Sequence, residues 1–201
     1  MQAILWTLIA FLCGSIPFSV IVGRLATGQD IRTYGDHNPG ATNVLRAANW
    51  GWFVLAGLLD YLKAAVPVGI PWLWLGVAEW DIVPIALAPL LGHAYSPWLR
   101  FRGGKGVAAT FGLWTGLTVG AAPIMLGLLL PVMFAVWAIN GWAVMLAMFS
   151  FGGFVWLQYG LDHPELMAVW LGNLALLGWK HRAELRQAPG IRPWLLRLVR
   201  Q

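Results

Sequence analysis

The sequence predicts an all-α integral membrane protein that crosses the bilayer several times. Of its 201 residues, 59% are hydrophobic and only 10% are charged, whereas a soluble domain carries about 25% charged residues. The mean hydropathy is +0.69, and seven apolar runs approach the roughly 20 residues that a bilayer-crossing helix needs. We therefore expect seven transmembrane helices, with six as the alternative, forming a single transmembrane domain over residues 1–201.

The apolar runs follow one another with little intervening sequence. The first covers about 3–26 and is interrupted by Gly14-Ser15-Ile16-Pro17; neighbouring groups in a membrane protein can satisfy the backbone groups that a proline frees. It lacks the basic start and small-residue cleavage pattern of a signal peptide, so we expect a retained helix. A polar stretch at 27–49 comes next. The other runs lie near 50–76, 82–98, 107–121, 122–139, 141–160 and 165–180, and only Gly120-Ala121-Ala122-Pro123 separates the fourth run from the fifth.

The charged residues predict the orientation of the chain. Lys and Arg number 13 against 8 Asp and Glu, and cytoplasmic loops carry the excess of basic residues. The connections after the second and sixth runs hold acidic residues and no Lys or Arg. We therefore expect the amino terminus outside and the carboxyl terminus in the cytoplasm. The basic residues on the cytoplasmic side would be Arg24, Arg32, Arg46, Arg100, Arg102, Lys105, Lys180, Arg182, Arg186, Arg192, Arg197 and Arg200.

Other compositional features fit a membrane protein. Many of the 14 tryptophans fall near predicted helix ends, where they anchor membrane proteins at the interface. The tail of 181–201 alternates apolar and basic residues and is expected to lie on the inner leaflet. The net charge of +5 is scattered as single residues in an apolar background, which argues against nucleic acid as a partner. The lone Cys13 can form no internal disulfide.

Two polar loops on the predicted cytoplasmic side are candidates for a functional site. The first reads Gly-Asp-His-Asn-Pro-Gly-Ala-Thr-Asn at 35–43. The second contains Arg102-Gly103-Gly104-Lys105-Gly106 and is followed by a predicted helix, an arrangement in which glycine amides, a cation and a helix start can bind phosphate. It is not a nucleotide-binding P-loop, because Leu99 and Gly106 stand where that motif has Gly and Ser or Thr. Considered alone, the second loop is also consistent with a tight turn that carries a topology signal.

Together, the two loops resemble a known enzyme family. The 35–43 segment, with Gly14-Ser15-Ile16-Pro17 before it and Gly92-His93 and 102–108 after it, resembles the acyl-phosphate:glycerol-3-phosphate acyltransferases of bacterial membranes, over nearly the whole chain. The resemblance implies a multi-pass protein of the bacterial plasma membrane that moves a fatty acyl group from acyl phosphate to glycerol 3-phosphate, giving lysophosphatidic acid and phosphate. It implies a cytoplasmic active site. No residues have metal-ligand spacing, so we expect no metal or organic cofactor, and we expect a monomer surrounded by membrane lipids. In this family the leaving phosphate is thought to take the proton of the attacking hydroxyl.

The resemblance also assigns roles to individual residues. Asn38, Thr42 and Asn43 would donate hydrogen bonds to phosphate, although loop capping is the alternative role for each. Arg46 and Lys105 would clamp glycerol 3-phosphate. The full expected site comprises Asn38, Thr42, Arg46, Lys105 and His181 as catalytic residues, and Asp36, Gly40, Asn43, His93, Gly103, Gly104 and Asn140 as substrate-binding residues.

The chain departs from the family pattern at three places. Asp36 stands where the family has Ser, so either Arg46 or Lys105 neutralises its charge or the site has changed. Asn140 lies in a turn whose family serine is missing and is a candidate replacement donor, and Glu184 follows the His181-Arg182 pair in place of an Asn. These departures leave a diverged, non-catalytic or altered-acceptor family member as the alternative, and a small transporter as a weaker one.

Asp60 and Lys63 lie one turn apart in the second run. We expect them to form a structural ion pair that borders the cavity of the active site.

Overall fold

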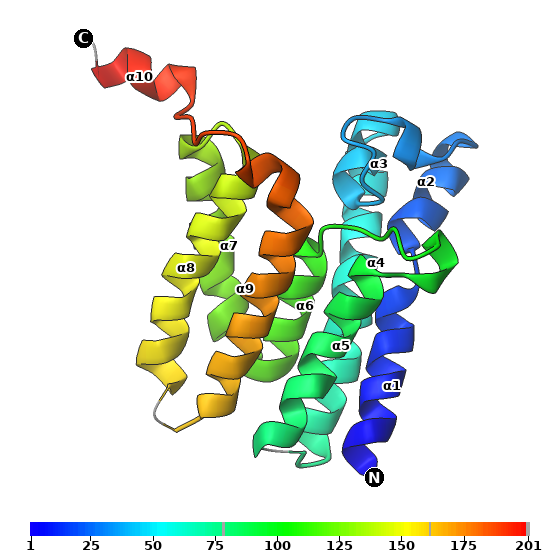
Figure 1. Ribbon diagram of the computed structural model, residues 1–201. Helices are drawn as coiled ribbons and strands as arrows, with labels where there is room; N and C mark the ends of the chain where they lie inside the picture. Colours follow the sequence, from blue (N-terminus) through cyan, green and yellow to red (C-terminus); the bar gives the residue numbers. More distant parts are fainter. Residues whose placement is uncertain (78, 161, 200–201) are drawn as a thin grey trace. The chain divides into compact units, whose positions relative to one another are not determined.

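The computed structural model describes residues 1–77, 79–160 and 162–199, and the described elements are helical apart from one isolated β-bridge (Figure 1). Residue contacts divide the chain into two compact units, residues 1–119 and residues 120–201. The predicted all-α class is confirmed.

The first unit contains both polar loops. Its first predicted run forms two helices, α1 (Gln2–Ser15) and α2 (Phe18–Thr27), because the helix stops at Ile16 and Pro17. The remaining elements of this unit are η1 (Ile31–Thr33), α3 (Ala41–Ala47), α4 (Trp50–Gly69), the π-helical turn η2 (Ile70–Trp74), η3 (Glu79–Asp81), α5 (Ile82–Ala94), η4 (Pro97–Leu99) and α6 (Val107–Thr118).

Small residues let the helices of the first unit approach closely. Helix α1 packs mainly on α5, and α4 packs mainly on α6 (Figure 1). A Cβ atom on Gly14 would overlap the backbone of Pro89, and one on Gly112 would overlap the carbonyl oxygen of Tyr61. Helix pairs in membranes rely on such backbone contact, because lipid supplies little hydrophobic driving force for helix association.

The second unit is a group of helices with an ordered connection to the tail. It contains α7 (Ala121–Val136), α8 (Asn140–Tyr159), α9 (Pro164–Leu185) and α10 (Pro193–Val199). Arg192 donates from Nε to the Phe134 carbonyl (2.7 Å), and Trp194 donates to the Ala135 carbonyl (3.1 Å). These donors satisfy carbonyl groups at the end of α7 that have no partner within the helix.

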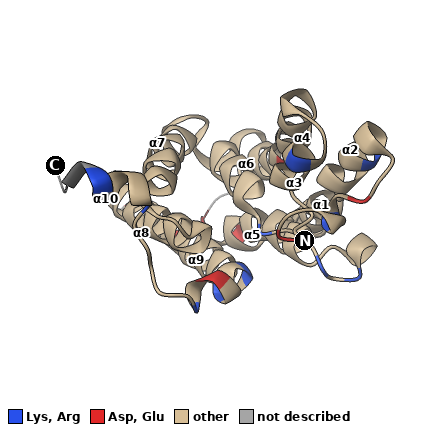
Figure 2. Cartoon of the chain, turned by 90° about the horizontal axis from the view of Figure 1, so that it is seen from above, with Lys and Arg blue, Asp and Glu red and all other residues tan. Residues whose placement is uncertain are grey.

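A helix is present at each of the seven predicted runs, and the boundary between the fourth and fifth runs falls at Val119 and Gly120. By length and composition, four helical segments among the described residues suffice to cross a membrane: Gln2–Thr27, Trp50–Trp74, Glu79–Leu99 and Asn140–Tyr159. Val107–Thr118 and Ala121–Val136 are shorter apolar helices. Seen end-on, the helices carry few charged residues (Figure 2).

Candidate active site

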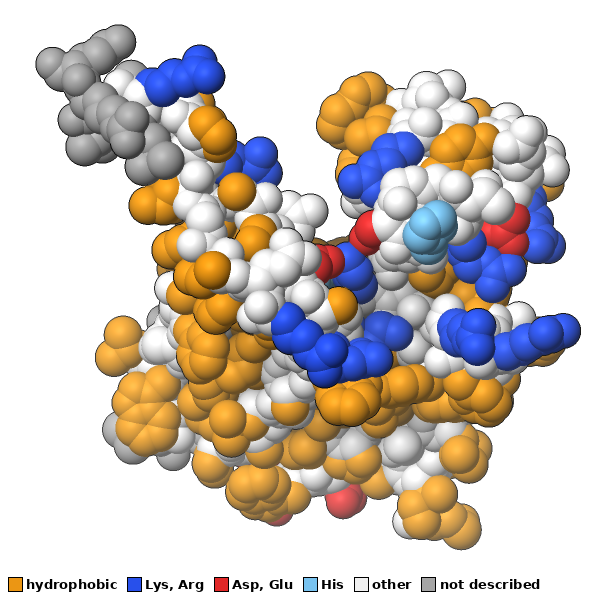
Figure 3. Space-filling view, turned by 45° about the horizontal axis from the view of Figure 1, so that its top comes forward, with side chains coloured by type: hydrophobic (Ala, Val, Ile, Leu, Met, Phe, Trp, Pro, Cys, Tyr) orange, Lys and Arg blue, Asp and Glu red, His pale blue; other side chains and the backbone are white. Residues whose placement is uncertain are grey.

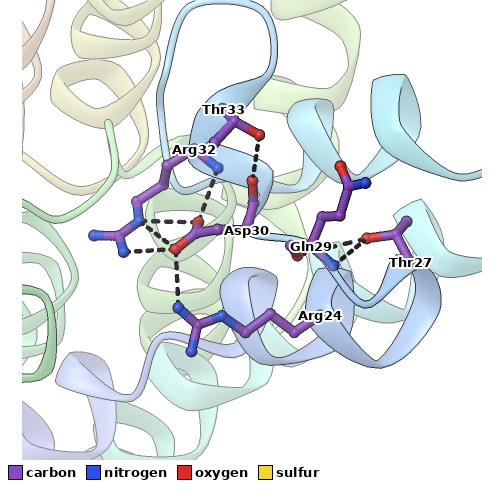
Figure 4. Close-up of polar contacts among 6 residues, drawn as sticks. All are labelled: Arg24, Thr27, Gln29, Asp30, Arg32 and Thr33. Atoms are coloured by element: carbon purple, nitrogen blue, oxygen red, sulfur yellow. Dashed lines mark hydrogen bonds and ion pairs between the residues drawn. The ribbon is translucent and has the colours of Figure 1, made fainter.

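The 28–40 loop is held at its start by one carboxylate. Asp30 accepts from the Arg32 guanidinium (2.6 Å) and the Arg32 backbone amide (3.0 Å), and it pairs with Arg24 (3.0 Å) (Figure 4). The hydrogen bonds from Arg32, followed by that from Arg24, hold the pKa of Asp30 well below its usual range. Arg24 and Arg32 were expected only as topology signals, but they also anchor this loop.

A second carboxylate, Asp36, lies at the centre of the predicted site. Its Oδ2 accepts a hydrogen bond from Lys105 Nζ (2.7 Å), and its Oδ1 lies 3.5 Å from an Arg46 guanidinium nitrogen. Oδ1 also accepts from Asn43 Nδ2 (3.1 Å) and from the Asn38 amide (3.4 Å). The structure therefore brings together five of the predicted site residues, four of them donors to one carboxylate.

Two further contacts tie this group to the loop backbone. Asn43, which is 1% exposed, donates to the Asn38 carbonyl (2.8 Å) and accepts from Arg46 (2.7 Å). Gly35 has φ +56° and its Cα lies directly against the Arg46 guanidinium. A side chain at residue 35 would be strained and would also displace Arg46. Gly35 was not expected as a site residue, although its place before Asp36 was visible in the sequence.

The Asp36 group is accessible to solvent. The side chains of Asp36 and Arg46 are 44% and 45% exposed, and that of Lys105 is 22% exposed. Partial burial raises the pKa of Asp36, but the hydrogen bond and charge of Lys105, with the Asn38 and Asn43 donors, lower it below its usual value. Of the two sequence-based alternatives for Asp36, the structure shows neutralisation by nearby cations. Figure 3 shows Lys and Arg side chains exposed on the face that it presents.

The glycines before Lys105 pack on the end of α5. The Gly103 amide donates to the Ala94 carbonyl and the Gly104 amide to the His93 carbonyl, both at 3.1 Å. The expectation that these amides converge on an anion is wrong, because the last carbonyls of α5 need donors and the loop supplies them. The Cα of Gly104 lies against the His93 imidazole. Through these contacts with the end of α5, including His93, the two glycines hold the loop that carries Lys105 in place.

A buried ion pair, Asp60 and Lys63, lies next to His93. Lys63 pairs with Asp60 (2.7 Å) and donates to the Ile16 carbonyl (2.7 Å), while Ser19 donates to Asp60. His93 Nδ1 lies 3.9 Å from Asp60 Oδ1. The cation therefore lies at the carboxyl end of α1 and the anion near the amino end of α2, where each complements the helix dipole. The predicted structural pair is confirmed, and it stabilises the break in the first span.

An apolar cavity of about 450 Å³ lies between α1, α2 and α4. Among the described residues that line it, Lys63 alone is charged, and its ammonium group is directed to Asp60 and the Ile16 carbonyl. The cavity therefore suits hydrocarbon rather than phosphate.

In the second unit, the start of α8 packs against the end of α9. His181 is 3% exposed, and its Nδ1 lies 3.4 Å from Glu184 Oε2. Gly141 packs against Glu184 and His181. The exposed Asn140 directly precedes Gly141 in the chain. Glu184, one of the three departures from the family pattern, therefore contacts a predicted catalytic residue.

Two other predicted residues, Thr42 and Gly40, also lie in the first unit. Thr42 is exposed in the first turn of α3, and Gly40 lies against the Asn38 amide group. Among the described residues, no group of three or more His, Cys, Asp or Glu side chains is placed to hold a metal ion.

Comparison with known sequences gives a consistent result. Residues 4–188 match the family model described as glycerol-3-phosphate acyltransferase. The chain is 33% identical to glycerol-3-phosphate acyltransferase 1 of Thermotoga maritima, over 89% of this chain and 94% of that protein. It is 38% identical to the glycerol-3-phosphate acyltransferase of Thermus thermophilus, over 93% of this chain and 92% of that protein.

Solved structures give the same match at the level of the fold. The chain superposes on a crystal structure of PlsY, an integral membrane glycerol 3-phosphate acyltransferase, in its glycerol 3-phosphate form, with a TM-score of 0.83 and 29% identity. The match covers 92% of this chain and 91% of that chain. The lysophosphatidic acid form of PlsY matches with a TM-score of 0.81 and 27% identity.

Proposed function

This chain belongs to the glycerol-3-phosphate acyltransferase family, and we propose that Lys105, Arg46 and the 36–43 segment form its phosphate site. It is a membrane enzyme of phospholipid synthesis that transfers a fatty acyl group from acyl phosphate to glycerol 3-phosphate. The products are lysophosphatidic acid and phosphate. A non-catalytic or transporter role is not favoured.

The reaction needs positioning and charge stabilisation more than a nucleophilic side chain. A hydroxyl oxygen of glycerol 3-phosphate attacks the acyl carbonyl carbon, a new C–O bond forms, and the bond from that carbon to the phosphate oxygen breaks. The hydroxyl proton passes to the departing phosphate. Because acyl phosphate is already activated, fixed donors that hold both substrates in reacting geometry supply the main catalytic effect.

One observation carries the assignment of the phosphate site. Lys105 Nζ, the Arg46 guanidinium, Asn43 Nδ2 and the Asn38 amide all lie within 3.5 Å of one carboxylate. A phosphate presents the same kind of acceptor oxygens with more charge, so the same four donors suit it. Lys105 and Arg46 bind the phosphate of glycerol 3-phosphate, and Asn38, Asn43 and Thr42 add hydrogen bonds.

The remaining predicted residues have supporting parts in this proposal. Gly103, Gly104 and His93 hold Lys105 in place from the end of α5, and Gly40 keeps the 36–43 segment compact. In the second unit, Glu184 orients His181, and Asn140 lies beside Gly141 at the start of α8.

The proposal extends to the topology of the enzyme. All seven predicted runs span the bacterial plasma membrane, with the amino terminus outside and the carboxyl terminus in the cytoplasm. The two units form one transmembrane acyltransferase domain, which agrees with a family match that crosses their boundary. The enzyme works as a monomer on acyl phosphate and glycerol 3-phosphate, with membrane lipids around it. Reporter fusions after residues 80 and 103 test this, because a cytoplasmic signal at residue 80 contradicts seven spans.

The site is tested by the transfer of palmitate from palmitoyl phosphate to glycerol 3-phosphate by the purified protein. Replacing one well-placed donor lowers turnover by about 100- to 1,000-fold in comparable sites, so we expect Lys105→Ala to lose at least about 100-fold in kcat/KM. Arg100→Ala removes an exposed cation from the same loop and is expected to stay near wild type. Undiminished activity in Lys105→Ala would overturn the assignment.

A further inference from the structure

The carboxylate of Asp36 occupies the donors that the proposed function gives to substrate phosphate, and the inference below rests on that function. Its Oδ2 accepts from Lys105 at 2.7 Å, and its Oδ1 faces Asn43 at 3.1 Å, the Asn38 amide at 3.4 Å and Arg46 at 3.5 Å. While the carboxylate keeps these contacts, it occupies the place and part of the donor capacity that a phosphate bound to the same four groups would use.

We propose that Asp36 is a tethered competitor of the substrate phosphate and that it sets which anions the enzyme accepts. A phosphate monoester carries a charge of about −1.5 to −2 at pH 7 and three acceptor oxygens, whereas a carboxylate carries one charge and two oxygens. A dianionic phosphate therefore displaces Asp36 from Lys105 and Arg46. A monocarboxylate of similar size gains nothing over the aspartate that is already there.

The exposure of the group makes this competition reversible. Asp36 is 44% exposed and Lys105 22% exposed, so both ions keep part of their contact with water. Exposed ion pairs contribute little net stability, and the substrate has only a small interaction to replace. Asp60 differs, since its 3% exposure beside Lys63 removes any route for an incoming anion to take its place.

The competition predicts a gain of affinity when Asp36 loses its charge. Two exposed pairs of ordinary strength correspond to a change of about two- to tenfold. In both Asp36→Asn and Asp36→Ser we expect the KM for glycerol 3-phosphate to fall by about that factor. We also expect glycerate, a monocarboxylate, to become a competitive inhibitor in these variants and not in wild type.

A binding measurement decides the inference without relying on turnover. The thermal stabilisation of the detergent-purified protein by inorganic phosphate is titrated in wild type, in both Asp36 variants and in Asp81→Asn. Asp81 is an exposed acid directly before α5, at the end opposite the Lys105 loop, so its variant makes the same charge change elsewhere. We expect the half-saturating phosphate concentration to fall about two- to tenfold in the Asp36 variants and to stay unchanged in Asp81→Asn.

The outcomes separate this inference from the proposed function. Half-saturation that is unchanged or higher in both Asp36 variants overturns the competition, including the case in which kcat falls and Asp36 proves to be a positioning residue. An equal fall in Asp81→Asn overturns it as well, because net charge would then be the cause. If no variant transfers acyl groups while the phosphate shift is present, the proposed function fails and the competition stands.

Discussion

Two aspartate–lysine pairs among the described residues differ in their surroundings. The Lys–Asp distance is 2.7 Å in both. Asp60 and Lys63 are each 3% exposed, whereas Asp36 is 44% and Lys105 is 22% exposed. In the buried pair, removal of one partner leaves an uncompensated charge in an apolar environment. In the exposed pair, water and ligands can replace either partner. Burial therefore makes the first pair structural and leaves the second available for function.

The largest expected effect comes from breaking the buried pair. Lys63→Ala leaves Asp60 without its cation and the Ile16 carbonyl without its donor, and removing one partner of a buried pair costs about 3–5 kcal/mol. We expect the free energy of unfolding in mixed micelles to fall by about that amount. Lys105→Ala is the matched control from the exposed pair and should cost about 1 kcal/mol or less. Equal destabilisation of the two variants would remove the distinction between the pairs.

A second variant tests the contact between Gly104 and His93, which lies between the Asp60–Lys63 pair and Lys105. A Cβ atom on Gly104 would overlap the imidazole of His93, which is 7% exposed and therefore has little room to move. Overpacking of this kind costs about 1–3 kcal/mol, so Gly104→Ala should lower the unfolding free energy by that amount. Gly153→Ala is the control, because its Cβ would meet nothing within 4 Å. A Gly104 variant as stable as the Gly153 variant would show that His93 yields easily.

Replacement of Arg46, which contacts the exposed Asp36, is a further test of the difference between the two pairs. Arg46 contacts Asp36 and Asn43 while 45% exposed, so its loss should affect substrate binding more than folding. We expect Arg46→Ala to raise the KM for glycerol 3-phosphate about tenfold, the loss of one charged hydrogen bond, and to change the melting temperature little. Arg24→Ala, which removes a cation in the last turn of α2 that pairs with Asp30, should leave KM unchanged. An unaltered KM in the Arg46 variant would place the substrate phosphate elsewhere.

The smallest effect is expected at Asp30, which belongs to neither pair. Its pKa is lower in the folded protein than the unfolded value of 3.8, chiefly because of Arg32. The ionised form therefore stabilises the fold above about pH 3.8, and this contribution is lost as the pH falls below that value. Because the Asp30 side chain keeps some contact with water, being 21% exposed, we expect Asp30→Asn to cost about 1 kcal/mol or less at pH 7. The difference in melting temperature between wild type and variant should stay constant from pH 7 to about pH 4 and shrink below it; a difference that does not shrink toward pH 3 would exclude the charge as the cause.

Hydropathy located the helices because lipid-facing segments must be both long and apolar. It placed the division between α6 and α7 within Gly120-Ala121-Ala122-Pro123, and the structure has it at Val119 and Gly120. The same reasoning found Asp60 and Lys63 as an i, i+3 pair on one helix. It did not find the Ile16 carbonyl as a third partner, because that contact depends on how the broken helix turns in space.

The sequence showed which residue types could form the site, but the role of each residue became clear only from the fold. Asn38, Asn43, Arg46 and Lys105 do converge, over a separation of up to 67 positions. The amides of Gly103 and Gly104 were assigned to an anion, but they cap α5. Local sequence shows that a glycine can bend the chain and expose an amide, but it does not show which carbonyl or ligand that amide will meet.

The most direct test of the phosphate site is an experimental structure with glycerol 3-phosphate bound. The account predicts the phosphate within hydrogen-bonding distance of Lys105 Nζ and the Arg46 guanidinium, with the Asp36 carboxylate moved away from Lys105 and the Asp60–Lys63 pair unchanged. A phosphate bound elsewhere, with the contact between Asp36 and Lys105 intact, would contradict it.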